Sequence, residues 1–82
     1  MRRIAKKIVI DTIPKVKDFV QQTAKFMHEV DVSSGNHTVD GRSLMGLLSL
    51  DLSKPVAVSY AEDDAELADI FLSKYFAKGG KG

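Results

Sequence analysis

The sequence predicts an α+β fold in which three helices cover one face of a four-stranded sheet. Four short stretches alternate apolar and polar residues or are rich in β-branched residues, as strands are. Three other stretches have the apolar spacing or the capping residues of helices. The expected order is strand, helix, strand, strand, helix, strand, helix. A two-layer sandwich accommodates this order with all helices on the same side.

The first strand is expected at residues 3–10, where Ile4, Ile8 and Ile10 share one parity. The first helix is expected at residues 13–27. Thr12 is suited to cap it, and Pro14 fits its first turn, where a missing N–H costs little. The predicted inner stripe of this helix consists of Val16, Phe19, Val20, Thr23, Ala24 and Met27.

A hairpin is expected after this helix. Val30 and Val32 alternate with polar residues, which is typical of a half-buried strand. The residues SSGN that follow are typical of a turn, and HTVD after them is predicted to be the return strand. The turn is therefore expected near Gly35 and Asn36.

The second half of the chain predicts a short helix, a strand and a last helix. Ser43 is suited to cap a short helix formed by LMGLLSL, in which Gly46 permits close packing. The stretch KPVAVSYA alternates as a strand does, and Pro55 suits the first position of a strand. Asp63 and Glu66 resemble the capping box of the last helix. The inner stripe of that helix is predicted to be Ala68, Phe71, Leu72 and Tyr75.

The composition favours one globular domain over residues 1–78, followed by a flexible tail at residues 79–82. The absence of cysteine excludes disulfides and thiolate metal sites and is typical of a cytoplasmic protein. No apolar stretch approaches the roughly 20 residues that span a bilayer, so no membrane insertion is expected. The net charge of +1 argues against nucleic acid as a direct partner. The basic residues of the first seven positions are interpreted as a solvated strand edge: Arg2, Arg3, Lys6 and Lys7.

A long block around Ser43 resembles a known family. The letters FVQQTAKF and GNHTVDGRSLMGLLSLDLSK are similar to the phosphocarrier protein HPr of the bacterial sugar phosphotransferase system. The resemblance extends from about residue 16 to residue 76 and is strongest at VDGRSLMGLLSL. It implies an open-faced β-sandwich with a four-stranded antiparallel sheet and three helices.

The first loop departs from that family. There the family carries a phosphoacceptor histidine, which takes a phosphoryl group from enzyme I, and an arginine at the start of the first helix. This sequence reads VIDTIPKVKDF, without histidine. A gapless count from Ser43 places Thr12 at the acceptor position and Pro14 at the arginine position. Because phosphate esters hold their phosphoryl group more tightly than phosphoimidazole does, a threonine is not expected to relay it.

Two interpretations of this loop stay open. Thr12, Lys15 and Lys17 are candidate anion-binding residues at a helix N-terminus, or they are a cap with two solvated lysines. The two histidines of the sequence, His28 and His37, are expected at the surface and do not have metal-ligand spacing. No metal site, cofactor or self-contained enzyme is expected.

Ser43 matches the serine that an ATP-dependent kinase phosphorylates in Gram-positive members of the family. The resemblance implies that Leu44, Met45 and Leu48 dock partner proteins. Arg42 is the candidate for pairing with the phosphate or for serving the kinase. The purely structural interpretation is that Ser43 is only a helix cap and that the three apolar residues belong to the core.

The leading hypothesis is a regulatory interaction protein similar to the histidine-less subclass called Crh, phosphorylated at Ser43. Its expected partners are HPr kinase/phosphorylase, a transcription regulator of carbon catabolite repression and other components of the phosphotransferase system. The alternative is a phosphocarrier or anion-binding component that uses the altered first loop. A third hypothesis is a structural relic with neither modification.

Overall fold

The expected strands form one antiparallel sheet in the order β1-β4-β2-β3 in the computed structural model, which describes residues 2–77. They are β1 (Arg3–Ile8), β2 (Asp31–Ser34), β3 (His37–Asp40) and β4 (Val56–Ala61). Gly35 and Asn36 make the two-residue turn between β2 and β3, as expected. Gly35 has φ 60°, which a type II′ turn requires at its first central position. The tail expected at residues 79–82 lies outside the described residues.

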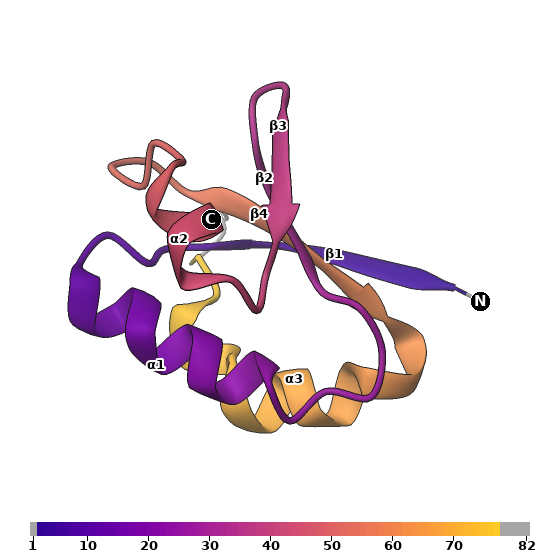
Figure 1. Ribbon diagram of the computed structural model, residues 1–82. Coiled ribbons are helices and arrows are strands. Elements are labelled where there is room, and N and C mark those ends of the chain that lie inside the picture. Colours follow the sequence, from indigo (N-terminus) through magenta and orange to yellow (C-terminus); the bar gives the residue numbers. More distant parts are fainter. Residues whose placement is uncertain (1, 78–82) are drawn as a thin grey trace.

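The register of the sheet separates an apolar face from a polar face. Ile8 pairs with Val56, and both are fully or almost fully buried. The neighbouring pair, formed by Lys7 and Ala57, faces the opposite way because side chains alternate along a strand. That second face carries small and polar side chains on all four strands, and the described helices do not cover it (Figure 1). The sandwich is therefore open-faced, as the sequence predicts.

Within residues 2–77, three α-helices lie against the apolar face: α1 (Ile13–Thr23), α2 (Leu44–Leu48) and α3 (Ala65–Phe71). Two 3₁₀ turns, η1 (Glu62–Asp64) and η2 (Ser73–Tyr75), precede and follow α3. Helices α1 and α3 both lie below the sheet in Figure 1. The short helix α2 lies beside the first half of α1, so the start of α1 and α2 form one end of the molecule (Figure 1).

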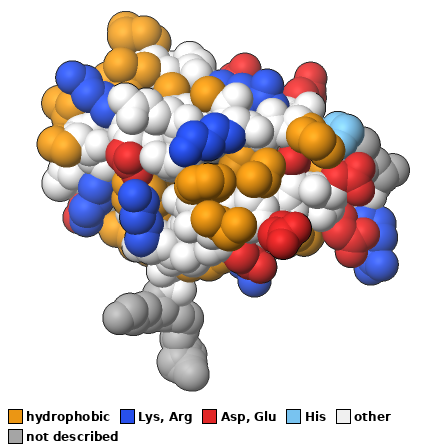
Figure 2. All heavy atoms as spheres, turned by 90° about the horizontal axis from the view of Figure 1, so that it is seen from below, with side chains coloured by type: hydrophobic (Ala, Val, Ile, Leu, Met, Phe, Trp, Pro, Cys, Tyr) orange, Lys and Arg blue, Asp and Glu red, His pale blue; other side chains and the backbone are white. Residues whose placement is uncertain are grey.

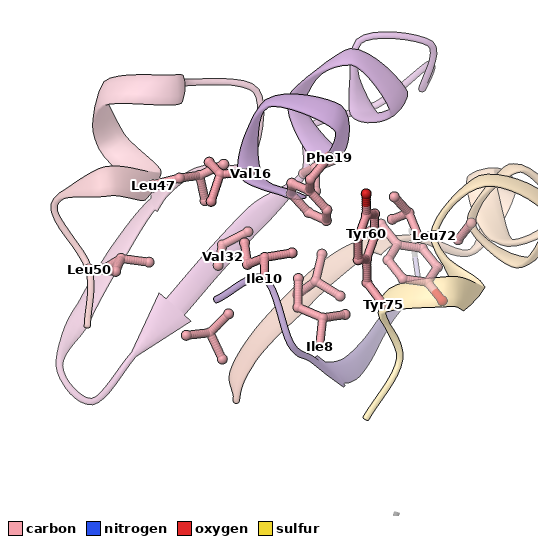
Figure 3. Close-up of a cluster of buried hydrophobic side chains, with 14 of the residues drawn as sticks. Ile8, Ile10, Val16, Phe19, Val32, Leu47, Leu50, Tyr60, Leu72 and Tyr75 are labelled. Atoms are coloured by element: carbon pink, nitrogen blue, oxygen red, sulfur yellow. The ribbon is translucent and has the colours of Figure 1, made fainter. Parts of the chain in front are cut away.

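The core lies between the sheet and the helices (Figure 3). Leu47 of α2 packs beside Val16 of α1, and Ile8 and Ile10 lie below them. Two aromatic pairs in edge-to-face geometry extend the core, Phe19 with Tyr75 and Phe26 with Tyr60, with centroid distances of 6.2 and 6.1 Å. Ile10 is buried although β1 ends at Ile8, two residues earlier than expected.

The first helix is shorter than predicted, because it ends at Thr23 and not at residue 27. The Thr23 hydroxyl donates to Gly41 O at 2.8 Å, which ties the helix end to the loop before α2. The next turn is tighter, since Phe26 N donates to Thr23 O at 3.0 Å. This tightening turns Phe26 into the core and leaves Ala24 and Met27 exposed, so their predicted place on the inner stripe is wrong.

The last helix also differs from the prediction at both ends. Asp63 makes no capping hydrogen bond, and the helix is entered through η1. It ends at Phe71, so that Tyr75 reaches the core from η2. Asp64 is the acidic residue that turns inward: its carboxylate accepts from Met27 N and His28 N, each at 2.9 Å. The bonds of Asp64 therefore hold the α1–β2 connection against the start of α3.

The basic residues near the N-terminus lie on an edge strand, as expected, and they are exposed. Arg3 also has a structural role, because its guanidinium donates to Glu29 O at 2.9 Å and to Ser59 O at 3.0 Å. The outer edge of β1 is partly paired, since Val9 N donates to Tyr75 O and Ala77 N donates to Lys7 O, both at 2.8 Å. The end of the described chain thus covers part of the free edge.

Asp18 joins α1 to η2, and its lowered pKa makes the stability of the fold depend on pH. Its carboxylate accepts from Tyr75 Oη at 2.5 Å and from Lys74 Nζ at 2.9 Å. The bond from Tyr75, followed by those from Lys74 and Gln22, lowers the pKa of Asp18 from 3.8 to about 2. A carboxyl whose pKa is lowered by folding stabilises the fold above its unfolded pKa, and the contribution is lost as the pH falls through the folded pKa.

We therefore expect Asp18→Asn to lower the midpoint of thermal unfolding at pH 7. The difference between Asp18→Asn and the original chain should shrink as the pH falls from 3.8 towards 2, because the original carboxyl becomes protonated there. Thermal unfolding followed by circular dichroism at a series of pH values measures this. Glu29→Gln is the control, because Glu29 is exposed and its side chain makes no ion pair in the described part of the chain. A difference that stays constant down to pH 2 would contradict the assignment to Asp18.

Candidate protein-docking site

Ser43 begins α2 and is held in a capping geometry. Its backbone is extended, with φ −105° and ψ 112°, and its Oγ accepts from Gly46 N at 3.0 Å. Gly46 allows this close approach, since a Cβ there would lie 3.1 Å from Ser43 Oγ and 3.3 Å from Val39 Cβ. The bond to Gly46 N confirms the sequence-based prediction of a capping serine. The Ser43 side chain is half-buried.

Helix α2 buries one side chain deeply and exposes two large apolar ones. Leu47 is fully buried, whereas Met45 is 76% exposed and Leu48 is 40% exposed. Leu44 is half-buried and packs against the core. The purely structural interpretation, in which Leu44, Met45 and Leu48 all belong to the core, is therefore wrong for Met45 and Leu48.

Ile13 is a further apolar residue at this end of the molecule. It lies in the first turn of α1, is 56% exposed, and belongs to the half of α1 beside which α2 lies. Reasoning from the sequence missed it because it falls outside the inner stripe of α1. We call Ile13, Ser43, Met45 and Leu48 the α2 surface. Exposed apolar side chains on neighbouring elements are typical of a surface that binds another protein.

Arg42 makes hydrogen bonds within the fold that the sequence did not indicate. Its Nη2 donates to Phe26 O at 3.3 Å and also to His28 O, in a short bond. The guanidinium therefore points to the α1–β2 connection. The Asp64 carboxylate holds the same connection by accepting from two of its backbone amides. In the structure, Arg42 therefore holds the α1–β2 loop through hydrogen bonds to two of its carbonyl groups, and its charge is not directed to Ser43.

The first loop offers few groups for an anion. Thr12 is the N-cap of α1, and its Oγ1 accepts from Lys15 N at 3.3 Å. Pro14 has no N–H to donate. Among the described residues, the first turn then keeps one backbone N–H without an acceptor, that of Ile13, because Val16 N is bonded to Thr12 O.

The charges of the first loop are also partly neutralised. Lys15 Nζ lies 3.0 Å from Asp11 Oδ1, and this hydrogen bond is the main reason why the pKa of Asp11 lies below its usual value. Lys17 is exposed on the next part of α1. An incoming phosphate would therefore meet an ionised carboxylate beside the cation that is closest to the cap.

The two histidines lie away from this loop. His37 is exposed at the start of β3. His28 is half-buried, and its Nε2 lies 3.3 Å from Asp63 Oδ2. No group of three or more histidine, cysteine, aspartate or glutamate side chains within residues 2–77 has the arrangement of a metal site. The described helices also include none with the length and apolar character of a membrane span.

Comparisons with known proteins agree with this architecture. Residues 15–77 match the family model described as the PTS HPr component phosphorylation site. No curated protein matches the chain. The structure is similar to HPr-C-His from Thermoanaerobacter tengcongensis, with 25% identity, a TM-score of 0.69 and coverage of 92% of this chain and 91% of that one. It also has the fold of the phosphocarrier protein HPr from Bacillus anthracis str. Ames, with 17% identity, a TM-score of 0.73 and coverage of 92% and 99%.

Proposed function

The chain belongs to the PTS HPr family, and we propose that it acts there as a regulatory interaction domain that is phosphorylated at Ser43. Partner proteins dock on the α2 surface, and the phosphate changes their affinity. The observation that carries the proposal is the pair of exposed side chains, Met45 and Leu48, in the short helix that Ser43 caps. The matched region begins at residue 15, so the first loop lies outside it.

Phosphorylation at Ser43 adds a strong charge beside an apolar surface without demanding a new fold. The reaction forms a bond between Ser43 Oγ and the γ-phosphorus of ATP, releases ADP and passes the hydroxyl proton to a base of the kinase. The product carries about −1.5 to −2 charges at pH 7. An anion at the start of a helix is electrostatically favourable, so α2 is expected to persist. Met45 suits such a surface because its flexible thioether adapts to different partners.

A relay of phosphate through histidine is not part of this proposal. Histidine occurs in the sequence only at positions 28 and 37, and neither lies at the start of α1. Thr12, which the gapless count places at the acceptor position, is engaged as a helix cap and faces the paired charges of Asp11 and Lys15. The proposal is therefore a domain of the histidine-less, Crh-like type. HPr kinase/phosphorylase, a catabolite-repression regulator and other phosphotransferase components are the proposed cytoplasmic partners.

Labelling distinguishes this function from a phosphocarrier function. The purified chain is incubated either with radiolabelled ATP and HPr kinase/phosphorylase or with radiolabelled phosphoenolpyruvate and enzyme I. We expect label from ATP only, and we expect Ser43→Ala to abolish it. Ser49→Ala is the matched control, since Ser49 is an exposed serine at the other end of the same helix. Label from phosphoenolpyruvate alone would overturn the proposal in favour of the carrier, and no label from either source would favour the structural relic.

A second measurement tests the docking surface. We expect Met45→Ser to weaken binding of the Ser43-phosphorylated chain to the catabolite-repression regulator by about tenfold, because one well-covered apolar side chain contributes about that much to an interface. Its thermal stability should stay unchanged, since Met45 is exposed. Met27→Ser is the matched control, as Met27 is a similarly exposed methionine in the α1–β2 loop, beyond the end of α1. Equal affinities for the two variants, measured by titration calorimetry, would exclude the α2 surface.

A further inference from the structure

A second group of exposed apolar side chains lies on α3 and the loop beside it. Ile70 is 63% exposed and Met27 is 69% exposed, whereas Leu67 and Phe71 are half-buried at the same helix. Figure 2 shows hydrophobic side chains gathered in the middle of the helical side of the molecule, with acidic side chains along one side of them. We call Met27, Leu67, Ile70 and Phe71, together with the exposed Glu62, Glu66 and Asp69, the α3 surface.

The contacts of the α1–β2 loop make this surface continuous. Asp64 binds the amides of Met27 and His28, so the loop rests on the start of α3. Two residues earlier in the loop, Lys25 Nζ lies 4.0 Å from the centroid of the Phe71 ring. Residues of the α1–β2 loop and of α3, from its start to Phe71, therefore form one face.

Apart from Lys25, which lies against Phe71, the charged side chains of α3 and η1 on this surface are acidic. Residues 62–69 include five acidic residues and no basic one. Asp64 is buried and bonded, and Asp63 lies within ion-pair distance of His28, but Glu62, Glu66 and Asp69 are exposed. The surface therefore presents carboxylates beside apolar side chains, the complement of a basic amphipathic segment.

The fold explains some of these residues but not all of them. Acidic residues at η1 and in the first turn of α3 are favoured by the positive end of the helix dipole. Asp69 lies in the last turn of α3, where a negative charge is unfavourable, and it has no ion-pair partner in the described part of the chain. Ile70, beside it, gains little from packing because it is exposed. Two adjacent residues that do not serve the stability of the helix are typical of a functional position.

We propose that the α3 surface binds a lysine- and arginine-rich amphipathic segment of a partner protein. The apolar side of the segment covers Ile70 and Met27, and its cations lie against Glu66, Asp69 and Glu62. This goes beyond the proposed function and does not depend on it, because α3 begins beside the end of α1, whereas α2 lies beside its start (Figure 1). The two surfaces are therefore free to hold different partners at the same time.

The proposal is tested with a leucine–lysine amphipathic helical peptide and its leucine–glutamate counterpart as probes. Amide shifts in ¹H–¹⁵N spectra of the full chain report which residues each peptide contacts. We expect the lysine peptide to shift the amide signals of residues 27 and 62–71. These shifts should become smaller as salt is added. The glutamate peptide should not shift these signals. The combined variant Asp69→Lys, Ile70→Ser should lower the affinity for the lysine peptide by about tenfold. Asp51→Lys, which reverses a carboxylate in the α2–β4 connection, is the charge control and should bind as the original chain does.

Thermal unfolding separates a binding role from a folding role. Asp69→Lys alone is expected to keep or raise the midpoint of unfolding, because it places a cation at the end of α3. The same substitution should lower the affinity for the lysine peptide. The proposal is overturned if the lysine peptide does not bind, shifts residues elsewhere, or binds the combined variant as well as the control. Concentration-dependent shifts at residues 62–71 without peptide would overturn it in favour of a second copy of this chain, and retention on vesicles of neutral phosphatidylcholine would overturn it in favour of a lipid surface.

Discussion

Replacing Asp64 with alanine is expected to lower the free energy of unfolding by about 3 kcal/mol, because two backbone amides lose their fully buried, charged acceptor. Asp64 is fully buried, and its two oxygens accept separately from Met27 N and His28 N, each at 2.9 Å. Alanine leaves both N–H groups without this acceptor at a site that is partly buried. Such a loss is a large part of the stability of an ordinary small domain. Urea unfolding followed by circular dichroism measures it.

Two further variants locate the cause. Asp64→Asn keeps the shape but turns an NH₂ group towards one of the two amides, so it is expected to be destabilising as well. Asp63→Ala is the control, because Asp63 is exposed and, within residues 2–77, its ion-pair contact is with His28 Nε2 alone. If Asp63→Ala were as costly as Asp64→Ala, the stabilising contribution would come from the general acidity of η1 and not from the two amide bonds.

The role of Asp64 also shows where reasoning from sequence stops. Three consecutive acidic residues before a helix are locally well explained by the helix dipole, and nothing in their spacing distinguishes the one that turns inward. The distinction comes from residues 27 and 28, which lie far from Asp64 in the chain and present free amides because α1 ends early. The early end itself depends on the bond between Thr23 and Gly41 O, another long-range contact. Local periodicity carried the predicted stripe on to Met27, whereas this contact puts Phe26 in the core.

Two features that depend only on neighbours in sequence agree with the prediction, whereas a third, the capping box at Asp63 and Glu66, does not. The hairpin at Gly35 and the cap at Ser43 need only turn and capping chemistry, and both are confirmed. The strand pattern was sufficient for the α+β class, although not for the exact ends of β1 and α3. In the candidate site, the place of Ser43 followed from sequence, but the direction of the Arg42 side chain did not. A long arginine reaches partners that spacing cannot identify, and here these are carbonyls of the α1–β2 loop.

Replacing Gly41 with alanine is expected to cost about 2 kcal/mol, because there is no room for a methyl group. A Cβ at this position would lie 2.7 Å from Val30 Cγ1 and 3.0 Å from Val30 O. The glycine cannot move away easily, since its N–H donates to Val30 O at 2.6 Å and its carbonyl accepts from Thr23 Oγ1 at 2.8 Å. Because Gly41 lies two residues before Ser43, the same substitution should also slow phosphorylation of Ser43.

The double variant Gly41→Ala, Val30→Ala tests whether this clash is the cause. Truncating Val30 removes the nearest side-chain atom but leaves its carbonyl, so it should relieve part of the strain. We therefore expect the double variant to be less destabilised than the sum of the two single variants, by about 1 kcal/mol in a double-mutant cycle of urea unfolding. Strict additivity would mean that Gly41 is needed for another reason. Gly46→Ala is a milder comparison, as its Cβ would come no closer than 3.1 Å to a neighbour, and that neighbour is Ser43 Oγ. A smaller loss of stability at Gly46 than at Gly41 would show that the backbone in front of Ser43 is held more tightly than the helix that follows it.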